Sequence, residues 1–146
     1  MKSKTILIAY KDPIWAEPLS EFFHGLGYRV EMATAVTQTV QRVLDGDIHV
    51  LLLDDEVEAM TASELVLLLK SVNRRVQAIV ISSQESLRVV RRLRSVGIFY
   101  HAMKPVDLEE LRSAVECAFA KIQREGFIEG LFSFFGPGRV MALCSS

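Results

Sequence analysis

Short apolar runs recur along this chain and alternate with amphipathic stretches of helical periodicity. The clearest run, Val50-Leu51-Leu52-Leu53, ends directly at an acid, Asp54. Apolar runs of four to eight residues between helical segments are typical of a parallel sheet that is covered on both faces. Five runs alternate with five helical segments, so we expect a doubly wound α/β fold built on one parallel sheet.

The boundaries of these elements follow from the runs and from local start and stop signals. Asp12-Pro13 is a helix start, because an acid can cap the helix and proline suits its first turn. The expected strands cover residues 5–9, 28–32, 49–53, 76–81 and 98–102, and the expected helices cover residues 13–24, 36–44, 63–72, 85–96 and 107–124. We expect one domain over residues 1–124 and an apolar tail, a helix and then a turn, over residues 125–146.

Four polar residues close or follow the apolar runs: Lys11, Asp54, Ser82 and Lys104. The carboxyl ends of parallel strands meet at one edge of the sheet, and working residues gather there. We therefore expect a carboxylate, a hydroxyl and two lysines to share a single crevice.

This constellation resembles the receiver domain of bacterial two-component response regulators, with no gap needed across the positions named. The resemblance covers about residues 4–124 and implies a flavodoxin-like sheet of strand order 2-1-3-4-5. It implies Asp54 as phosphoacceptor, Ser82 and His101 as switch residues, and Lys104, followed by Pro105, as the phosphate-binding lysine.

The resemblance breaks at the end of the first strand. Receivers carry two adjacent acids there that hold a magnesium ion, and this chain has Tyr10 and Lys11. One acid at Asp54 would then face two lysines, so the crevice has little need of a metal. We expect no cofactor. Mg²⁺ stays a doubtful option, for which Asp12 and Glu56 are weak candidate ligands.

The lysine at position 11 allows two hypotheses about the function of the chain. It could form a buried ion pair with Asp54, so that the chain is a degenerate receiver that binds proteins without phosphorylation. Alternatively, the ammonium group of Lys11 could occupy the place that the magnesium ion has in receivers, and Asp54 would remain a working phosphoacceptor. A remote third reading, a small flavodoxin-like ligand-binding enzyme, requires a glycine-rich phosphate loop that the sequence lacks. We expect a signalling module and not an enzyme.

Charged residues on the last two helices indicate where partners could bind. The basic set is Arg88, Arg91 and Arg94, and the acidic set is Glu109, Glu110 and Glu116. In receivers this surface serves dimers and partners, so the resemblance implies a homodimer or a protein partner such as a histidine kinase or another signalling protein. Pairing between the two helices inside one molecule is an equal alternative.

The tail after Arg124 is rich in phenylalanine. Phe127, Leu131, Phe132 and Phe135 form part of a broad apolar stripe before Gly136-Pro137-Gly138. It could fold back onto the domain or form a dimer or partner interface. We do not expect a membrane surface as its target, because the stripe has no basic face of its own.

Composition excludes several other classes of protein. The net charge of −1 gives no global attraction for nucleic acid, and no apolar run approaches a membrane span of about 20 residues. Cys117 lies in the apolar periodicity of the last helix, where we expect it in the core, and the cysteine usage suits the cytoplasm.

Overall fold

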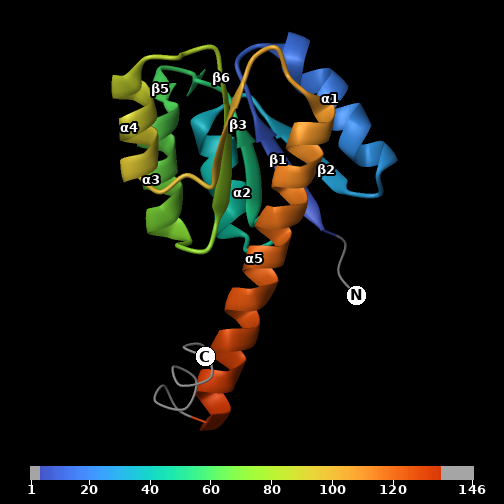
Figure 1. The fold of residues 1–146 in the computed structure, drawn as a ribbon, viewed down its shortest axis with the longest axis vertical. Coiled ribbons are helices and arrows are strands. Elements are labelled where there is room, and N and C mark those ends of the chain that lie inside the picture. Colours follow the sequence, from blue (N-terminus) through green and yellow to red (C-terminus); the bar gives the residue numbers. More distant parts are fainter. Residues whose placement is uncertain (1–3, 136–146) are drawn as a thin grey trace.

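The computed structural model describes the backbone of residues 4–135 and the side chains of residues 4–128. Its centre is a five-stranded parallel sheet in the order β2-β1-β3-β6-β7, as Figure 1 shows. The strands are β1 (Thr5–Ala9), β2 (Arg29–Ala33), β3 (Val50–Leu53), β6 (Gln77–Ser82) and β7 (Tyr100–Met103). Counted over these five strands the order is 2-1-3-4-5, so the predicted fold is confirmed.

Five helices cover the sheet: α1 (Pro13–Gly25), α2 (Val36–Leu44), α3 (Ala62–Val72), α4 (Leu87–Ser95) and α5 (Leu108–Phe135). Alternate strand residues face opposite sides. Ile6 and Ile8 of β1 pack in one cluster with α1 and α5, and Leu7 of the same strand packs in the other with α2, α3 and α4. Each face of the sheet therefore has its own apolar core.

The local signals at the start of α1 work as predicted. Oδ1 of Asp12 accepts a hydrogen bond of 2.9 Å from the backbone N–H of Ile14, and Pro13 is the first helical residue. Gly27 follows the helix at φ 94°, a left-handed conformation that glycine adopts without steric cost. The turn leads the chain directly into β2.

A two-stranded hairpin follows Asp54. It consists of β4 (Glu56–Val57) and β5 (Met60–Thr61), which pair antiparallel. Its base is anchored because the N–H of Ala62 donates to the carbonyl of Asp55 at 2.8 Å, and its turn is anchored because Glu58 accepts from the N–H of Val36. Val57 is fully buried, and this apolar anchor explains why the acidic segment is ordered.

The predicted end of the last helix near Arg124 was wrong. α5 continues without a break to Phe135, and in Figure 1 it projects past the edge of the sheet. Gly126 and Gly130 each disfavour a helix by about 1 kcal/mol, which does not stop it when the flanking residues are good helix formers. The predicted turn at 136–138 lies outside the described residues.

The predicted core position of Cys117 was also wrong, because its thiol is exposed. The buried face of α5 is carried by Leu111, Val115 and Ala118. Position 117 follows Val115 by two residues, a spacing that turns it away from that face.

Candidate functional site

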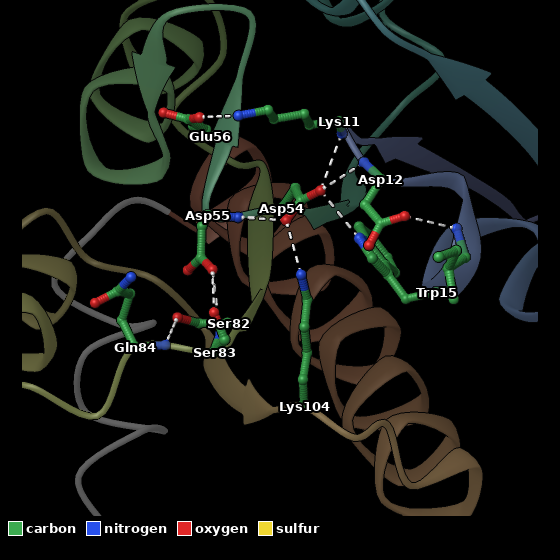
Figure 2. Close-up of polar contacts among 11 residues, drawn as sticks. Lys11, Asp12, Trp15, Asp54, Asp55, Glu56, Ser82, Ser83, Gln84 and Lys104 are labelled. Atoms are coloured by element: carbon green, nitrogen blue, oxygen red, sulfur yellow. Dashed lines mark hydrogen bonds and ion pairs between the residues drawn. The ribbon is translucent and has the colours of Figure 1, made fainter.

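Side chains that follow β1, β3 and β7, namely Lys11, Asp54 and Lys104, line one groove at one edge of the sheet, whereas Ser82 at the end of β6 is not part of its lining. Figure 2 shows Asp54, which follows β3, near the centre, with Lys104 after β7 below it and Lys11 and Asp12 of the loop after β1 above it and to the right. The open groove of about 830 Å³ begins at Asp54 and Lys104 and extends to Ser63 and Arg92 between α3 and α4.

The carboxylate of Asp54 is enclosed, with 4% of the residue exposed. Its Oδ2 accepts hydrogen bonds from the backbone N–H of Lys11 at 2.9 Å, the backbone N–H of Asp12 at 3.1 Å and Nε1 of Trp15 at 3.0 Å. Its Oδ1 accepts from the N–H of Asp55 at 2.8 Å and from Nζ of Lys104 at 3.2 Å. Five donors therefore surround one carboxylate.

These contacts decide the charge of Asp54. Burial alone raises the pKa of a carboxyl group, since it disfavours the ionised form. The hydrogen bonds from Lys11, Trp15, Asp12 and Asp55 together outweigh that effect, and the pKa of Asp54 falls below its ordinary value. Asp54 is thus an ionised carboxylate at neutral pH.

The side chain of Lys11 does not pair with Asp54, so that interpretation was wrong. Its Nζ forms an ion pair with Glu56 across the mouth of the crevice, and 63% of the side chain is exposed. The hydrogen bond to Glu56 raises the pKa of Lys11. A hydrated ammonium at the surface avoids the desolvation cost of burial, and backbone donors already occupy the nearest oxygen of Asp54.

The other substituted position, Tyr10, is part of the core. Its side chain is partly buried and packs against the cluster that contains α1 and α5, and its N–H donates to the carbonyl of Ala33 at 3.0 Å. At the two positions that the resemblance assigns to metal-binding acids, the structure thus has a packed aromatic ring and a lysine that is turned outward.

The two weak candidate ligands for magnesium, Asp12 and Glu56, both have other partners in the structure. Glu56 is engaged by Lys11, and Asp12 caps α1 with one carboxylate oxygen. Among the described side chains, no group of three or more His, Cys, Asp or Glu is arranged to hold a metal ion.

Ser82 and Ser83 lie at the end of β6, beside the base of the hairpin. Ser82 is completely buried, and its Oγ accepts a 2.9 Å hydrogen bond from the N–H of Gln84. Ser83 donates to Oδ2 of Asp55 from its N–H at 3.1 Å and has its Oγ 3.2 Å from the same atom. The hydroxyl of Ser82 is thus used locally, and its role as a switch stays a prediction.

His101 lies within β7 and is partly buried. Its Nε2 is enclosed and has no hydrogen-bond partner among the described residues. The ring therefore occupies an interior position as a half-buried aromatic, and its role as a switch residue also stays a prediction.

Trp15 is the site residue that sequence reasoning missed. It occupies an apolar position of α1, which predicts a core residue, and 7% of its surface is exposed. A buried indole N–H normally finds a hydrogen-bond partner. That rule, applied to the chain's single tryptophan on a helix that starts beside the crevice, could have identified it.

Comparisons with known proteins identify the family and the fold of this chain. A family model described as the response regulator receiver domain matches residues 6–116. Sporulation initiation phosphotransferase F of Bacillus subtilis (strain 168) is 26% identical over 98 residues, which are 67% of this chain and 79% of that protein. The DNA-binding transcriptional regulator NtrC of Azospirillum brasilense is 28% identical over 118 residues, which are 81% of this chain and 24% of that longer protein.

Solved structures show the same fold. The CheY-like receiver domain protein from Methanospirillum hungatei JF-1 has a TM-score of 0.79 at 20% identity and covers 85% of this chain and 99% of its own. The signal receiver domain of a LuxO repressor-type protein from Vibrio parahaemolyticus has a TM-score of 0.80 at 13% identity, covering 88% of this chain and 98% of its own. The chain belongs to the response regulator receiver domain family of two-component signalling.

Proposed function

We propose that this receiver works by binding a partner protein in a state that does not depend on phosphate at Asp54. The observation that carries the proposal is the set of five donors around the Asp54 carboxylate. The chain has no catalytic output of its own in this proposal.

Phosphoryl transfer to Asp54 would need one of its oxygens as a free nucleophile. Oδ2 accepts three hydrogen bonds, and Oδ1 accepts from Asp55 and from the ammonium of Lys104. An ionised carboxylate offers about four lone-pair sites in all, so an attack would require existing bonds to break.

The transferring phosphoryl group also needs its charge neutralised. Metal ions and cationic side chains do this in known phosphoryl-transfer sites. Here Lys104 already pairs with Asp54 at 3.2 Å, and Lys11 is held by Glu56. Both lysines are committed to carboxylates of the protein itself, which supports a site that is stable without phosphate.

The proposed partner surface lies on α4 and α5. Arg88, Arg91 and Arg94 are exposed on α4, and within the described part of the chain they form no ion pair. Pairing between the two helices in one molecule is therefore not what holds these arginines, and they are available to an acidic partner surface.

The acids of α5 are exposed too. Glu116 accepts a 3.2 Å hydrogen bond from Arg112 of its own helix, and Glu109 lies 4.0 Å from the same guanidinium. Glu110 is exposed beside them. A two-fold homodimer that sets each α4 against the partner's α5 would pair the two sets, and a histidine kinase or another signalling protein could use the same surface.

A second candidate function, a working phosphoacceptor, has one specific observation in its favour. Asp54 is ionised, and Lys104 lies 3.2 Å from its Oδ1, where a lysine could also contact an incoming phosphoryl group. This function requires Asp54 to give up hydrogen bonds that it makes in the resting state.

The indole N–H resonance of Trp15 distinguishes the two functions, because Trp15 donates directly to Asp54. We expect this NMR signal to stay unchanged when acetyl phosphate and magnesium are added to the folded protein. A shifted signal that Asp54→Asn abolishes would support the phosphoacceptor instead.

A further inference from the structure

The lysines of this chain differ in what surrounds their ammonium groups. Of the five lysines that the structure describes, four contact a group that favours a positive charge. The four pairs are Lys11 with Glu56, Lys104 with Asp54, Lys121 with Glu125, and Lys4 with the ring of Phe119. Carboxylates and aromatic faces both stabilise an ammonium group. The fifth lysine, Lys70 of α3, forms no ion pair or hydrogen bond within the described part of the chain.

The side chain of Lys70 packs instead against a turn of the backbone. A Cβ atom built at Gly97 would lie 2.9 Å from Nζ of Lys70 and 3.8 Å from its Cε, so the end of the lysine lies on this glycine. Gly97 has a φ of 80° and lies between α4 and β7. Because Lys70 is partly buried, water solvates its ammonium group less than that of an exposed lysine.

A second ammonium group lies in the same region. Nζ of Lys121 on α5 lies 5.8 Å from the centre of the Phe99 ring, and Phe99 follows Gly97 by two residues. Burial lowers the pKa of Lys70, and the charge of Lys121 lowers it further, whereas Glu125 acts in the opposite direction. At a given pH, a larger share of Lys70 than of an ordinary lysine is therefore the neutral amine.

A neutral amine is a nucleophile, whereas an ammonium group is not. Desolvation and a neighbouring cation both activate lysine nucleophiles in proteins. Lys70 has both features, and a small reagent can reach it because it is only partly buried. Phe99 directly precedes β7, so this region lies at the edge of the sheet opposite Asp54. A reaction at Lys70 is therefore independent of the crevice and of the function proposed for it.

From this arrangement we propose that Lys70 is an acylation site of this protein and that its acyl donors are acyl phosphates, such as acetyl phosphate. The lone pair of Nζ attacks the carbonyl carbon and forms a C–N bond, and the bond between that carbon and the bridging oxygen breaks. Phosphate leaves with the bonding electrons and takes up the proton that Nζ loses. The positive charge of Lys121 favours a donor whose leaving group is anionic. The product is a neutral acyl-lysine, and no phosphate stays on the protein.

Site-resolved mass spectrometry of the full-length protein tests the proposal. The folded protein is incubated with acetyl phosphate at a series of pH values, and peptides from a protease that cleaves after acidic residues report the acetylated fraction of each lysine. Lys70→Arg keeps the positive charge and removes the nucleophile. Lys121→Gln removes the neighbouring charge, and Lys11→Gln makes the same charge change at the opposite edge of the sheet. Circular dichroism verifies that each variant is folded.

We expect Lys70 to be acetylated several-fold faster than the exposed Lys4, and Lys70→Arg to lose this fast reaction. Lys121→Gln should shift the rate profile of Lys70 towards higher pH, whereas Lys11→Gln should leave it unchanged. A rate at Lys70 that is no higher than that at Lys4 would overturn the proposal. So would a pH profile of Lys70 that is the same in Lys121→Gln as in wild type. Acetyl and phosphate adducts differ in mass, and acetylation of Lys70 should persist in Asp54→Asn, so this result is distinguishable from phosphorylation.

Discussion

Nε1 of Trp15 donates a 3.0 Å hydrogen bond to Oδ2 of Asp54, so the first turns of α1 are tied directly to the acid at the centre of the crevice. Both residues are buried. A hydrogen bond to an enclosed charge is stronger than one between neutral groups. This contact therefore helps to keep Asp54 ionised, and it engages Oδ2 of Asp54 in a hydrogen bond.

The first expected outcome concerns that bond. Trp15→Phe keeps an aromatic ring and removes the donor, and a hydrogen bond to a charged group contributes about 1.5–3 kcal/mol. Urea unfolding of wild type, Trp15→Phe, Asp54→Asn and the double variant forms a double-mutant cycle, which separates the bond from the loss of ring volume. We expect a coupling energy of about 1–3 kcal/mol, and a value near zero would show that the bond does not form in solution.

The second expected outcome concerns the dependence of the protein's stability on pH. The pKa of Asp54 is below its ordinary value in the folded protein, so its ionised form adds stability at pH values above the ordinary carboxyl pKa. That contribution is lost as the pH falls through the lowered pKa of the folded state. Urea midpoints between pH 7 and pH 2 should therefore fall more steeply for wild type than for Asp54→Asn in the acid range. Parallel curves for the two proteins would contradict the lowered pKa.

The third expected outcome concerns the two positions that the resemblance assigns to metal-binding acids. Tyr10→Asp with Lys11→Asp places acids at both positions and also frees Glu56 from its ion pair. We expect this variant to acquire magnesium affinity, because carboxylates converging on one point suit that ion. Trp15 fluorescence is the measurement, since the indole contacts Asp54. Lys11→Ala is the control and should show no response, and a silent double variant that is folded would count against the geometry.

How far the sequence predicts this molecule differs from feature to feature. The strands are predictable because buried parallel strands are continuous apolar runs, and Leu51 and Leu53 are fully buried as that pattern requires. The meeting of Asp54 and Lys104 is predictable because parallel strands end at the same edge. Periodicity and strand order therefore suffice for the fold and for the centre of the site.

The direction of a long flexible side chain is not predictable in the same way. Lys11 could reach either Asp54 or Glu56, and the choice depends on the hairpin that presents Glu56 and on the backbone donors that fill Oδ2 of Asp54. Neither is visible in the apolar pattern. The continuation of α5 past Arg124 was missed because its end was placed by a change in composition and not by a helix-stop signal.

The fourth expected outcome concerns the partner face. Arg88→Glu/Arg91→Glu should weaken a homodimer or partner complex that uses α4, and Glu109→Arg/Glu110→Arg should do so from the α5 side. If each α4 faces the partner's α5, the combination of both changes restores association, because the opposite charges are exchanged. Sedimentation velocity at low salt measures this for the homodimer, and a combined variant that associates no better than either parent would exclude the two-fold arrangement.

Intact mass spectrometry is the most direct test of the claim that Asp54 is held apart from phosphorylation. The folded wild-type protein is incubated with acetyl phosphate, with and without magnesium, and Asp54→Asn is treated in parallel. We expect no phosphate adduct on the wild-type protein in either condition. A mass increase of one phosphate group that is absent from Asp54→Asn would contradict the proposal and make this chain a working phosphoacceptor.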